Sequence, residues 1–252
     1  MTPLQTIYTI SKKIAGIAGF NLEVTKKVKK ITDGVHEPIS VKASYAPWLS
    51  DHSFNNVYEI IKNYTLVSKY RCYELWQLVE ESVKLKGALI EIGTWRGGSG
   101  ALIAKKARLS DIKDTVYLCD TFKGVVKAGK RDSSYKGGEH SDASREMVEE
   151  VINKLKLDNT EILVGIFPEK TSNLVTDKTF RFCHIDVDVY QSAKDIMEWL
   201  WPKLVVGGIV VFDDYGFQKC DGIMCFVNEE RNKKDRLVIH NLNGHAIVVK
   251  LF

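Results

Sequence analysis

Two acidic pairs stand directly after apolar segments of the sequence. Asp186 and Asp188 follow one apolar run, and Asp213 and Asp214 follow another. If the two runs are neighbouring parallel strands, their carboxyl ends lie about 5 Å apart and the acids gather at one edge of the sheet. Four carboxylates in so small a space repel one another and resist ionisation. A divalent cation such as Mg²⁺, Mn²⁺ or Ca²⁺ would remove this conflict, because oxygen is the ligand that these ions prefer.

The alternative for the same acids is structural. Aspartate is a good N-cap residue, so an acid at the end of a strand can begin the helix that follows. Capping does not require two pairs, and we therefore favour the metal site. His184 lies just before Asp186, within the apolar run. It is a candidate base or a buried core histidine, and we favour the core.

A glycine-rich segment from Glu91 to Gly100 joins a third apolar run to a predicted helix. Glycines let the backbone turn tightly and let a ligand approach the N–H groups of a helix N-terminus. Asp120 ends the next predicted strand, where its carboxylate can bind both hydroxyls of a nucleoside ribose. The glycines lack the G-x-G-x-x-G spacing of a dinucleotide site. The combination suits S-adenosylmethionine (SAM) at least as well as NAD, and a tight turn without a ligand is the structural alternative.

A methyl donor and a cation on one rim together predict methyl transfer to oxygen. The sulfonium of SAM is a strong electrophile, whereas an alcohol is a poor nucleophile until it loses its proton. An adjacent divalent ion makes that loss easier, and a carboxylate near the metal can accept the proton.

The elements that must position these residues alternate along the chain. Short apolar runs alternate with helical stretches after residue 87, which is typical of a parallel sheet with helices on both faces. The predicted strands are 88–92, 115–120, 160–165, 180–186 and 208–213, and the predicted helices lie near 99–109, 143–155 and 193–201. Two more runs, 237–241 and 245–252, flank Asn243-Gly244 and predict a terminal hairpin.

Residues 1–86 are predicted to form an N-terminal helical extension or cap, and residues 87–252 the SAM-binding core. Within the extension, Leu4, Ile7, Ile10, Ile14 and Ile17 have the spacing of an amphipathic helix. Residues 34–51 look irregular, and residues 56–85 read as helix. The polar stretch 123–144, rich in glycine and serine, is predicted to be a mobile lid.

The composition is that of an ordinary globular domain, with 44% hydrophobic and 27% charged residues. A net charge of +4 is small for a dedicated nucleic-acid binder. No segment approaches the ~18 apolar residues of a membrane span, so we expect no stable membrane insertion. The five cysteines are scattered without zinc spacing, which favours a reducing cytoplasm. The N-terminal stripe can pair with another subunit, and we expect a homo-oligomer.

Several segments together resemble the macrocin O-methyltransferase family, often called the TylF type, whose members methylate sugar hydroxyls on natural products. The matching segments are Ala46–Asp51 with Phe54, Glu91–Ser99, Asp120–Gly124, Gly165–Glu169 with Thr171, His184–Tyr190 and Gly207–Gly216. The resemblance implies a Rossmann-like class I methyltransferase fold. Its seven-stranded, mostly parallel sheet would have the order 3-2-1-4-5-7-6, with the last strand antiparallel. The acceptor would be a sugar, either free, nucleotide-linked or part of a glycoside.

The resemblance also implies roles for individual residues. Asp186, Asp213 and Asp214 would hold Mg²⁺, on which two neighbouring sugar hydroxyls can chelate. Asp188 would be the catalytic base, with His184 as the second candidate. The residues that would contact SAM are Glu91, Gly93, Thr94, Arg96, Ser99, Asp120, Ser141, Asp142 and Asp186.

Other interpretations stay open at this point. A catechol-type O-methyltransferase would use a similar metal on aromatic diols, and an NAD-dependent oxidoreductase would also fit the glycine-rich turn with its downstream acid. Tyr45, Trp48 and Phe54 either form a platform for a sugar ring or pack the N-terminal extension.

Overall fold

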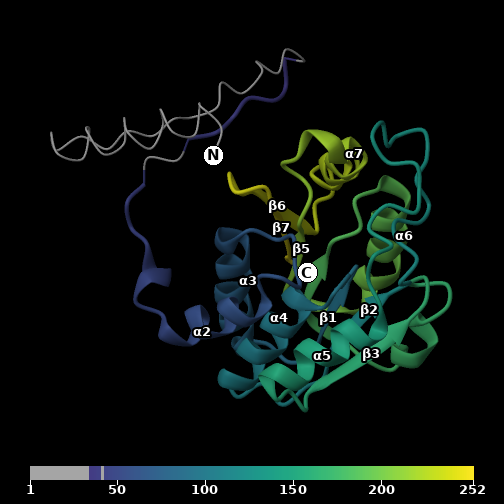
Figure 1. Cartoon of the computed structure of the whole chain (residues 1–252). Helices are drawn as coiled ribbons and strands as arrows, with labels where there is room; N and C mark the ends of the chain where they lie inside the picture. Colours follow the sequence, from purple (N-terminus) through teal and green to yellow (C-terminus); the bar gives the residue numbers. More distant parts are fainter. Residues whose placement is uncertain (1–33, 41–42) are drawn as a thin grey trace, which may run out of the picture. The chain divides into compact units, whose positions relative to one another are not determined.

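The computed structural model describes residues 34–40 and 43–252 (Figure 1). The predicted amphipathic stripe from Leu4 to Ile17 lies outside the described residues. The chain divides into two compact units, Met1–Ala43 and Ser44–Phe252. All helices and strands described below belong to the second unit. Among the described residues, no helix is both long enough and apolar enough to cross a membrane.

A seven-stranded sheet forms the centre of the second unit. Its strands are β1 (Ala88–Ile92), β2 (Val116–Asp120), β3 (Thr160–Val164), β4 (Phe180–Ile185), β5 (Leu204–Phe212), β6 (Arg236–His240) and β7 (Ala246–Lys250). The strand order is β3-β2-β1-β4-β5-β7-β6. Strands β1 to β5 are parallel to their neighbours, while β7 is antiparallel to both β5 and β6. The predicted class I methyltransferase topology, including its antiparallel last strand, is confirmed.

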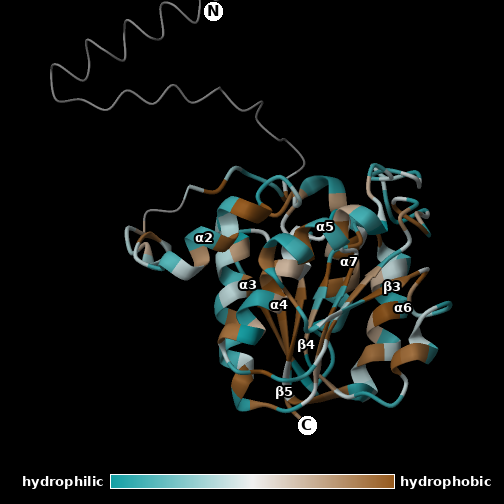
Figure 2. Ribbon diagram, turned by 60° about the horizontal axis from the view of Figure 1, so that its bottom comes forward, coloured by the Kyte–Doolittle hydropathy of each residue, from teal (hydrophilic) through white to brown (hydrophobic). Residues whose placement is uncertain are grey.

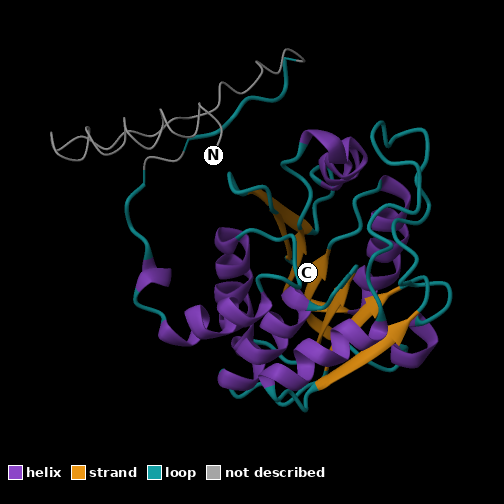
Figure 3. Cartoon of the chain, in the orientation of Figure 1, coloured by secondary structure: helices purple, strands orange, loops and turns teal. Residues whose placement is uncertain are grey.

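Helices cover both faces of the sheet (Figures 1 and 3). On one face lie α2 (His52–Ile61), α3 (Lys69–Glu81), α4 (Gly98–Leu109) and α5 (Arg145–Leu155), and on the other lie α6 (Tyr190–Leu200) and α7 (Asp221–Glu230). Successive strand residues point to opposite faces, so Leu118 enters the first apolar layer and Cys119 the second. The strands are accordingly apolar along most of their length (Figure 2).

The helix predicted over residues 56–85 is two helices, which corrects that prediction. Residues 62–68 leave the helical path, and Ser68 then caps α3 by accepting a hydrogen bond from the backbone N–H of Arg71. Within the break, the carbonyl of Tyr64 accepts a hydrogen bond from the N–H of Gly98 at 2.9 Å. A Cβ on Gly98 would lie 2.7 Å from that carbonyl oxygen. The break is therefore determined by contact with the glycine-rich turn, although the segment contains no glycine or proline.

The helices α2 and α3 pack directly on the sheet domain. The side chains of Phe54 and Trp76 are buried in the same apolar layer as Leu102 of α4. Trp48 packs edge-on against Tyr70 and Tyr73. These contacts match the packing interpretation of Trp48 and Phe54. Tyr45 is exposed, and its role stays a prediction.

Candidate active site

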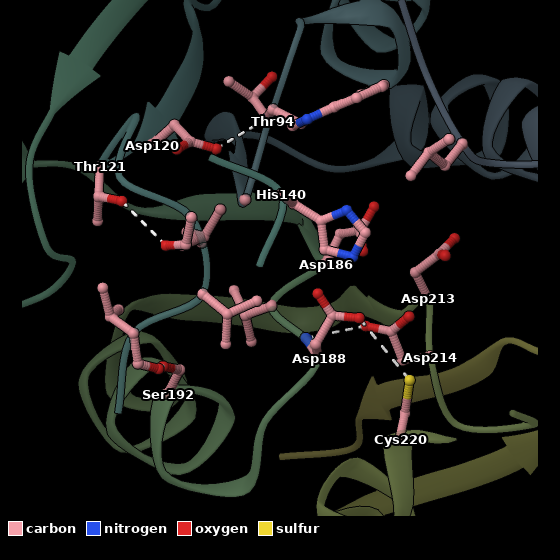
Figure 4. A pocket seen from close by; sticks show the side chains of 18 of the residues that line it. Thr94, Asp120, Thr121, His140, Asp186, Asp188, Ser192, Asp213, Asp214 and Cys220 are labelled. Atoms are coloured by element: carbon pink, nitrogen blue, oxygen red, sulfur yellow. Dashed lines mark hydrogen bonds between the residues drawn. The ribbon is translucent and has the colours of Figure 1, made fainter. Parts of the chain in front are cut away.

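The candidate site lies at the carboxyl ends of β1, β2, β4 and β5. The backbone hydrogen bonds of the sheet continue one residue past β4 and β5. The N–H of Asp186 donates to the carbonyl of Ile92, and the N–H of Asp213 donates to the carbonyl of Ile185. A cavity of about 390 Å³ opens at this edge. Its lining includes Asp120 and four other predicted acids, namely Asp186, Asp188, Asp213 and Asp214 (Figure 4).

Asp186, Asp213 and Asp214 come together as the sequence predicted. One carboxylate oxygen from each lies within 4.8 Å of the others. Burial, together with repulsion from the neighbouring carboxylates, raises the pKa of Asp186 and of Asp214 well above the ordinary value. Three converging oxygen donors whose negative charges oppose one another are the donor set that Mg²⁺, Mn²⁺ or Ca²⁺ prefers. The residues present therefore fit such an ion.

Asp213 differs from its neighbours because cationic and polar groups surround it. Its Oδ2 pairs with the guanidinium of Arg71, and its Oδ1 lies 2.9 Å from Nε2 of His245 and 3.5 Å from Nε2 of His184. Burial opposes ionisation of Asp213, but these partners hold its pKa well below the ordinary value. Asp213 is thus the acid of the cluster that stays charged most readily.

Asp188 is held in a defined orientation beside the cluster. Its Oδ1 accepts a hydrogen bond of 2.5 Å from the hydroxyl of Tyr135, and the thiol of Cys220 lies 3.7 Å from the same oxygen. The backbone N–H of Asp188 donates to Asp214 at 3.1 Å, with a φ of +63° at Asp188. Burial raises the pKa of Asp188, although the bond from Tyr135 and the charge of His140 act in the opposite direction. Asp188 also lines the cavity.

Tyr135 belongs to the loop between β2 and α5, and its hydroxyl reaches Asp188 at the site. Its buried Asp132 accepts a hydrogen bond from the N–H of Tyr190, the first residue of α6. The N–H of Ser133 donates to Asp221 at the start of α7. These bonds tie the loop to two helices, and its opening as a lid stays a prediction.

The glycine-rich turn and Asp120 form another wall of the cavity. Gly93 has a φ of +90°, and a Cβ there would lie 1.7 Å from the carbonyl oxygen of Asp186. Only glycine fits at this position. Thr94 and Ser99 also line the cavity. The two oxygens of Asp120 accept backbone hydrogen bonds of 2.7 Å from Trp95 and Phe122, which fix the carboxylate at the cavity wall.

Two of the predicted residues lie behind this wall. Glu91 is fully buried, where it accepts a 2.5 Å hydrogen bond from Thr94 and contacts Nδ1 of His184 at 2.8 Å. His184 is equally buried and lies outside the lining of the cavity. Its Nε2 lies 3.5 Å from Oδ1 of Asp213 and has no hydrogen-bond partner among the described residues, so His184 lies between Glu91 and Asp213 but is hydrogen-bonded only to Glu91. The contact of Glu91 with SAM and the role of His184 as a base stay predictions.

Three further predicted residues lie outside the lining of the cavity. Arg96 and Asp142 form an ion pair of 2.5 Å, and the indole N–H of Trp95 also donates to Asp142. Ser141 is exposed, whereas the preceding His140 lines the cavity. Their roles in binding SAM stay predictions as well.

Sequence reasoning missed Arg71, Tyr135 and His245 as site residues. Arg71 lies 142 residues from its partner Asp213, and Tyr135 lies 53 residues from Asp188. His245 follows the predicted Asn243-Gly244 turn. That turn, together with an antiparallel last strand, is the one signal that would have placed His245 near the acids.

Comparison with known proteins decides the family. The sequence model described as Macrocin-O-methyltransferase (TylF) matches residues 59–243. The chain belongs to this family. Membership and fold make it a SAM-dependent O-methyltransferase, as the sequence segments suggested.

Relatives within the macrocin O-methyltransferase group are moderately similar. Demethyldecarbamoylnovobiocin O-methyltransferase of Streptomyces niveus is 30% identical over 186 residues, which cover 68% of this chain and 69% of the relative. The 8-demethyl-8-(2,3-dimethoxy-alpha-L-rhamnosyl)-tetracenomycin-C 4'-O-methyltransferase of Streptomyces olivaceus is 28% identical, with 62% of this chain and 64% of the relative covered. The match thus spans about two thirds of the length of each.

Solved structures agree with the family assignment. The structure of the O-methyltransferase NovP superposes with a TM-score of 0.65 at 26% identity, covering 75% of this chain and 83% of NovP. The calicheamicin methyltransferase CalS11 superposes with a TM-score of 0.62 at 14% identity, covering 82% of this chain and 94% of CalS11, and supports the fold alone.

Proposed function

We propose that this macrocin O-methyltransferase family member transfers the methyl group of SAM to a sugar hydroxyl of a glycosylated natural product, with Mg²⁺ or a similar divalent cation. The observation that carries the proposal is that one cavity contains both a glycine-rich turn with Asp120 and a cluster of three carboxylates beside Asp188. The first wall suits a nucleoside with a charged amino-acid tail, and the second suits a metal-chelating diol. The rhamnosyl substrate in the name of the tetracenomycin relative supports a sugar acceptor.

The residues divide the work of the reaction between them. Asp120 would accept hydrogen bonds from the ribose hydroxyls of SAM. Asp186, Asp213 and Asp214 would hold the cation, which when bound lowers the pKa of a coordinated hydroxyl. Oδ2 of Asp188 would accept the hydroxyl proton, because Oδ1 is occupied by Tyr135. The acceptor oxygen then bonds to the methyl carbon while the carbon–sulfur bond breaks, leaving S-adenosylhomocysteine (SAH).

A catechol-type acceptor is the second candidate for the same site. Family membership favours the sugar. An NAD-dependent oxidoreductase has lost its support, since the family and the fold are those of methyltransferases.

The acceptor can be tested by incubating the protein with SAM and a panel of glycosides, free sugars, nucleotide sugars and catechols, followed by mass spectrometry. We expect a gain of one methyl group on compounds with neighbouring sugar hydroxyls, with Mg²⁺ present and not with excess EDTA. Methylation of catechols alone would overturn the sugar assignment, and full activity in EDTA would overturn the metal assignment.

Replacing Asp120 with alanine is expected to raise the Kd for SAM about 10- to 100-fold, because hydrogen bonds to a charged group contribute about 1.5–3 kcal/mol. Isothermal titration with SAM measures the effect. Asp158→Ala removes an exposed acid that pairs with Arg108 and serves as the matched control. A Kd equal to that of the parent, in a variant that unfolds at a similar temperature, would show that Asp120 does not bind the ribose.

A further inference from the structure

A buried row of polar side chains connects α3 to the candidate metal ligand Asp213. Nδ1 of His245 lies 2.5 Å from Oε2 of Glu74, and Nε2 of the same ring lies 2.9 Å from Oδ1 of Asp213. The histidine is fully buried, and only 15% of the Glu74 side chain is exposed. Each ring nitrogen of His245 thus lies within hydrogen-bond distance of one carboxylate. The side-chain amide of Asn241 donates to the other oxygen of Glu74.

The position of His245 follows from the sheet topology. Strands β5 and β7 are antiparallel, with Phe212 paired to Ala246. The next residue of β5 and the preceding residue of β7 are Asp213 and His245, so the register places them opposite each other. The imidazole of His245 contacts Oδ1 of Asp213, and the guanidinium of Arg71 contacts Oδ2 of the same carboxylate.

The three candidate metal ligands differ in how many neighbouring side chains hold their carboxylates in place. Asp213 has contacts with Arg71, His184 and His245. Among the residues that the structure describes, neither Asp186 nor Asp214 has an ion pair with a cationic side chain. Asp214 accepts one backbone hydrogen bond from Asp188, whereas Asp213 has three side-chain partners. The orientation of Asp213 is therefore the most firmly fixed before a cation arrives, and the row from Glu74 contributes to fixing it.

A purely structural role does not explain the choice of side chains. Burying charged and polar groups costs free energy, and well-packed hydrophobic residues of similar volume often stabilise a fold equally well or better. Ligands of metal ions, by contrast, commonly have an outer hydrogen-bonded partner that fixes their orientation, and loss of that partner costs about 10- to 100-fold in metal affinity. The Glu74–His245 pair has this arrangement toward Asp213.

We propose that Glu74 and His245 are positioning residues that orient Asp213 for binding of the divalent cation. The proposal rests on the metal-dependent function proposed above. Glu74 fixes the ring of His245, and the ring fixes Oδ1 of Asp213, so that the remaining lone pairs of the carboxylate face the cavity. Helix α3 and the turn before β7, which are far apart in the sequence, thereby act on one metal ligand.

The test measures cation binding directly and does not depend on turnover. Isothermal titration of Mn²⁺ into the full-length protein saturated with SAH gives the Kd of the cation, and a separate titration with SAM serves as the second readout. We expect His245→Leu and Glu74→Gln to raise the Kd for Mn²⁺ about 10- to 100-fold. The Kd for SAM should stay within about twofold of the parent value. His245→Gln, which keeps an N–H donor near the position of Nε2, should recover most of the affinity for Mn²⁺.

A matched control lies on the same helix. Glu80 of α3 pairs with Lys106 and has 60% of its side chain exposed, so Glu80→Gln should bind Mn²⁺ as the parent does. If His245→Leu fails to fold, Glu74→Gln and His245→Gln still give the comparison. Unchanged Mn²⁺ affinity in Glu74→Gln and His245→Leu would overturn the proposal. An equal loss of SAM and Mn²⁺ affinity would also overturn it, because that result indicates general collapse of the cavity.

Two other outcomes separate this proposal from the function on which it rests. Absence of Mn²⁺ binding in the parent protein would overturn the metal-dependent function and the positioning role together. A stoichiometric transition metal in the purified parent, detected by elemental analysis and lost in His245→Leu, would make the ring a metal ligand itself and would overturn the positioning role alone.

Discussion

Asp188→Asn is expected to lower kcat by about 10²- to 10⁴-fold, the usual contribution of a general base. Asparagine has nearly the shape of aspartate and can still accept the hydrogen bond from Tyr135, but its amide nitrogen cannot take the acceptor's proton. The carboxylate cluster is untouched, so affinities for SAM and Mn²⁺ should remain near those of the parent. Steady-state kinetics on a glycoside that the parent enzyme methylates give kcat, and titrations with SAM and with Mn²⁺ give the two affinities.

Tyr135→Phe is the informative comparison for this variant. It removes the hydroxyl that fixes Oδ1 of Asp188 and leaves the base in place. We expect a smaller fall in kcat than in Asp188→Asn. If Asp188→Asn retains most of the parent activity, Asp188 is not the base, and His184 becomes the next candidate despite its burial.

Asp214→Asn is expected to weaken cation binding strongly and to lower turnover by at least about 10²-fold, because one of three oxygen ligands loses its charge. The Kd for SAM should change little. Titration with Mn²⁺ and activity measured against Mg²⁺ concentration provide the check. Unchanged values of both would show that the acidic cluster does not bind the catalytic cation.

The stability of the metal-free variants should distinguish the two adjacent acids. Burial, together with repulsion from Asp188 and Asp213, raises the pKa of Asp214, so Asp214→Asn removes an unfavourable buried charge and should leave Tm unchanged or higher. Asp213→Asn instead leaves the buried guanidinium of Arg71 without its carboxylate, and breaking such a pair costs about 3–5 kcal/mol. Thermal unfolding in EDTA therefore should show a lower Tm for the Asp213 variant only, and the opposite order would contradict the charge distribution described here.

The sequence predicted those parts of the site that depend on strand ends. An acid directly after a buried strand must emerge at the carboxyl edge of a parallel sheet, so the positions of Asp120, Asp186 and Asp213 followed from local pattern. The partners of Asp213 did not follow, since Arg71 and His245 reach it only through the packing of α3 and the register of β7. The Asn243-Gly244 turn predicts the hairpin that carries His245, but no local signal indicates the contact of Arg71 with Asp213.

The difference between local pattern and long-range contact also explains two errors in the predicted secondary structure. No element was predicted over residues 221–230, which form α7 with Gly222 in its first turn. The structure gives the reason for this residue: a Cβ there would lie 1.8 Å from an oxygen of Asp132. The interruption between α2 and α3 likewise depends on the contact of Tyr64 with Gly98. In both places the local secondary structure is coupled to a tertiary contact.

The interruption between α2 and α3 also bears on how the enzyme can be redesigned. Thr65, Leu66 and Val67 line the cavity from this short connection, and Phe217 lines it from the segment after β5. None of these residues lies on the strand ends that carry the acids. Val67 packs in the apolar core and Thr65 packs against Gly98, whereas the side chain of Leu66 is exposed. The size of residue 66 can therefore be varied while the chemical groups keep their places, and this position is the natural starting point for broadening or switching the range of glycosides that are methylated.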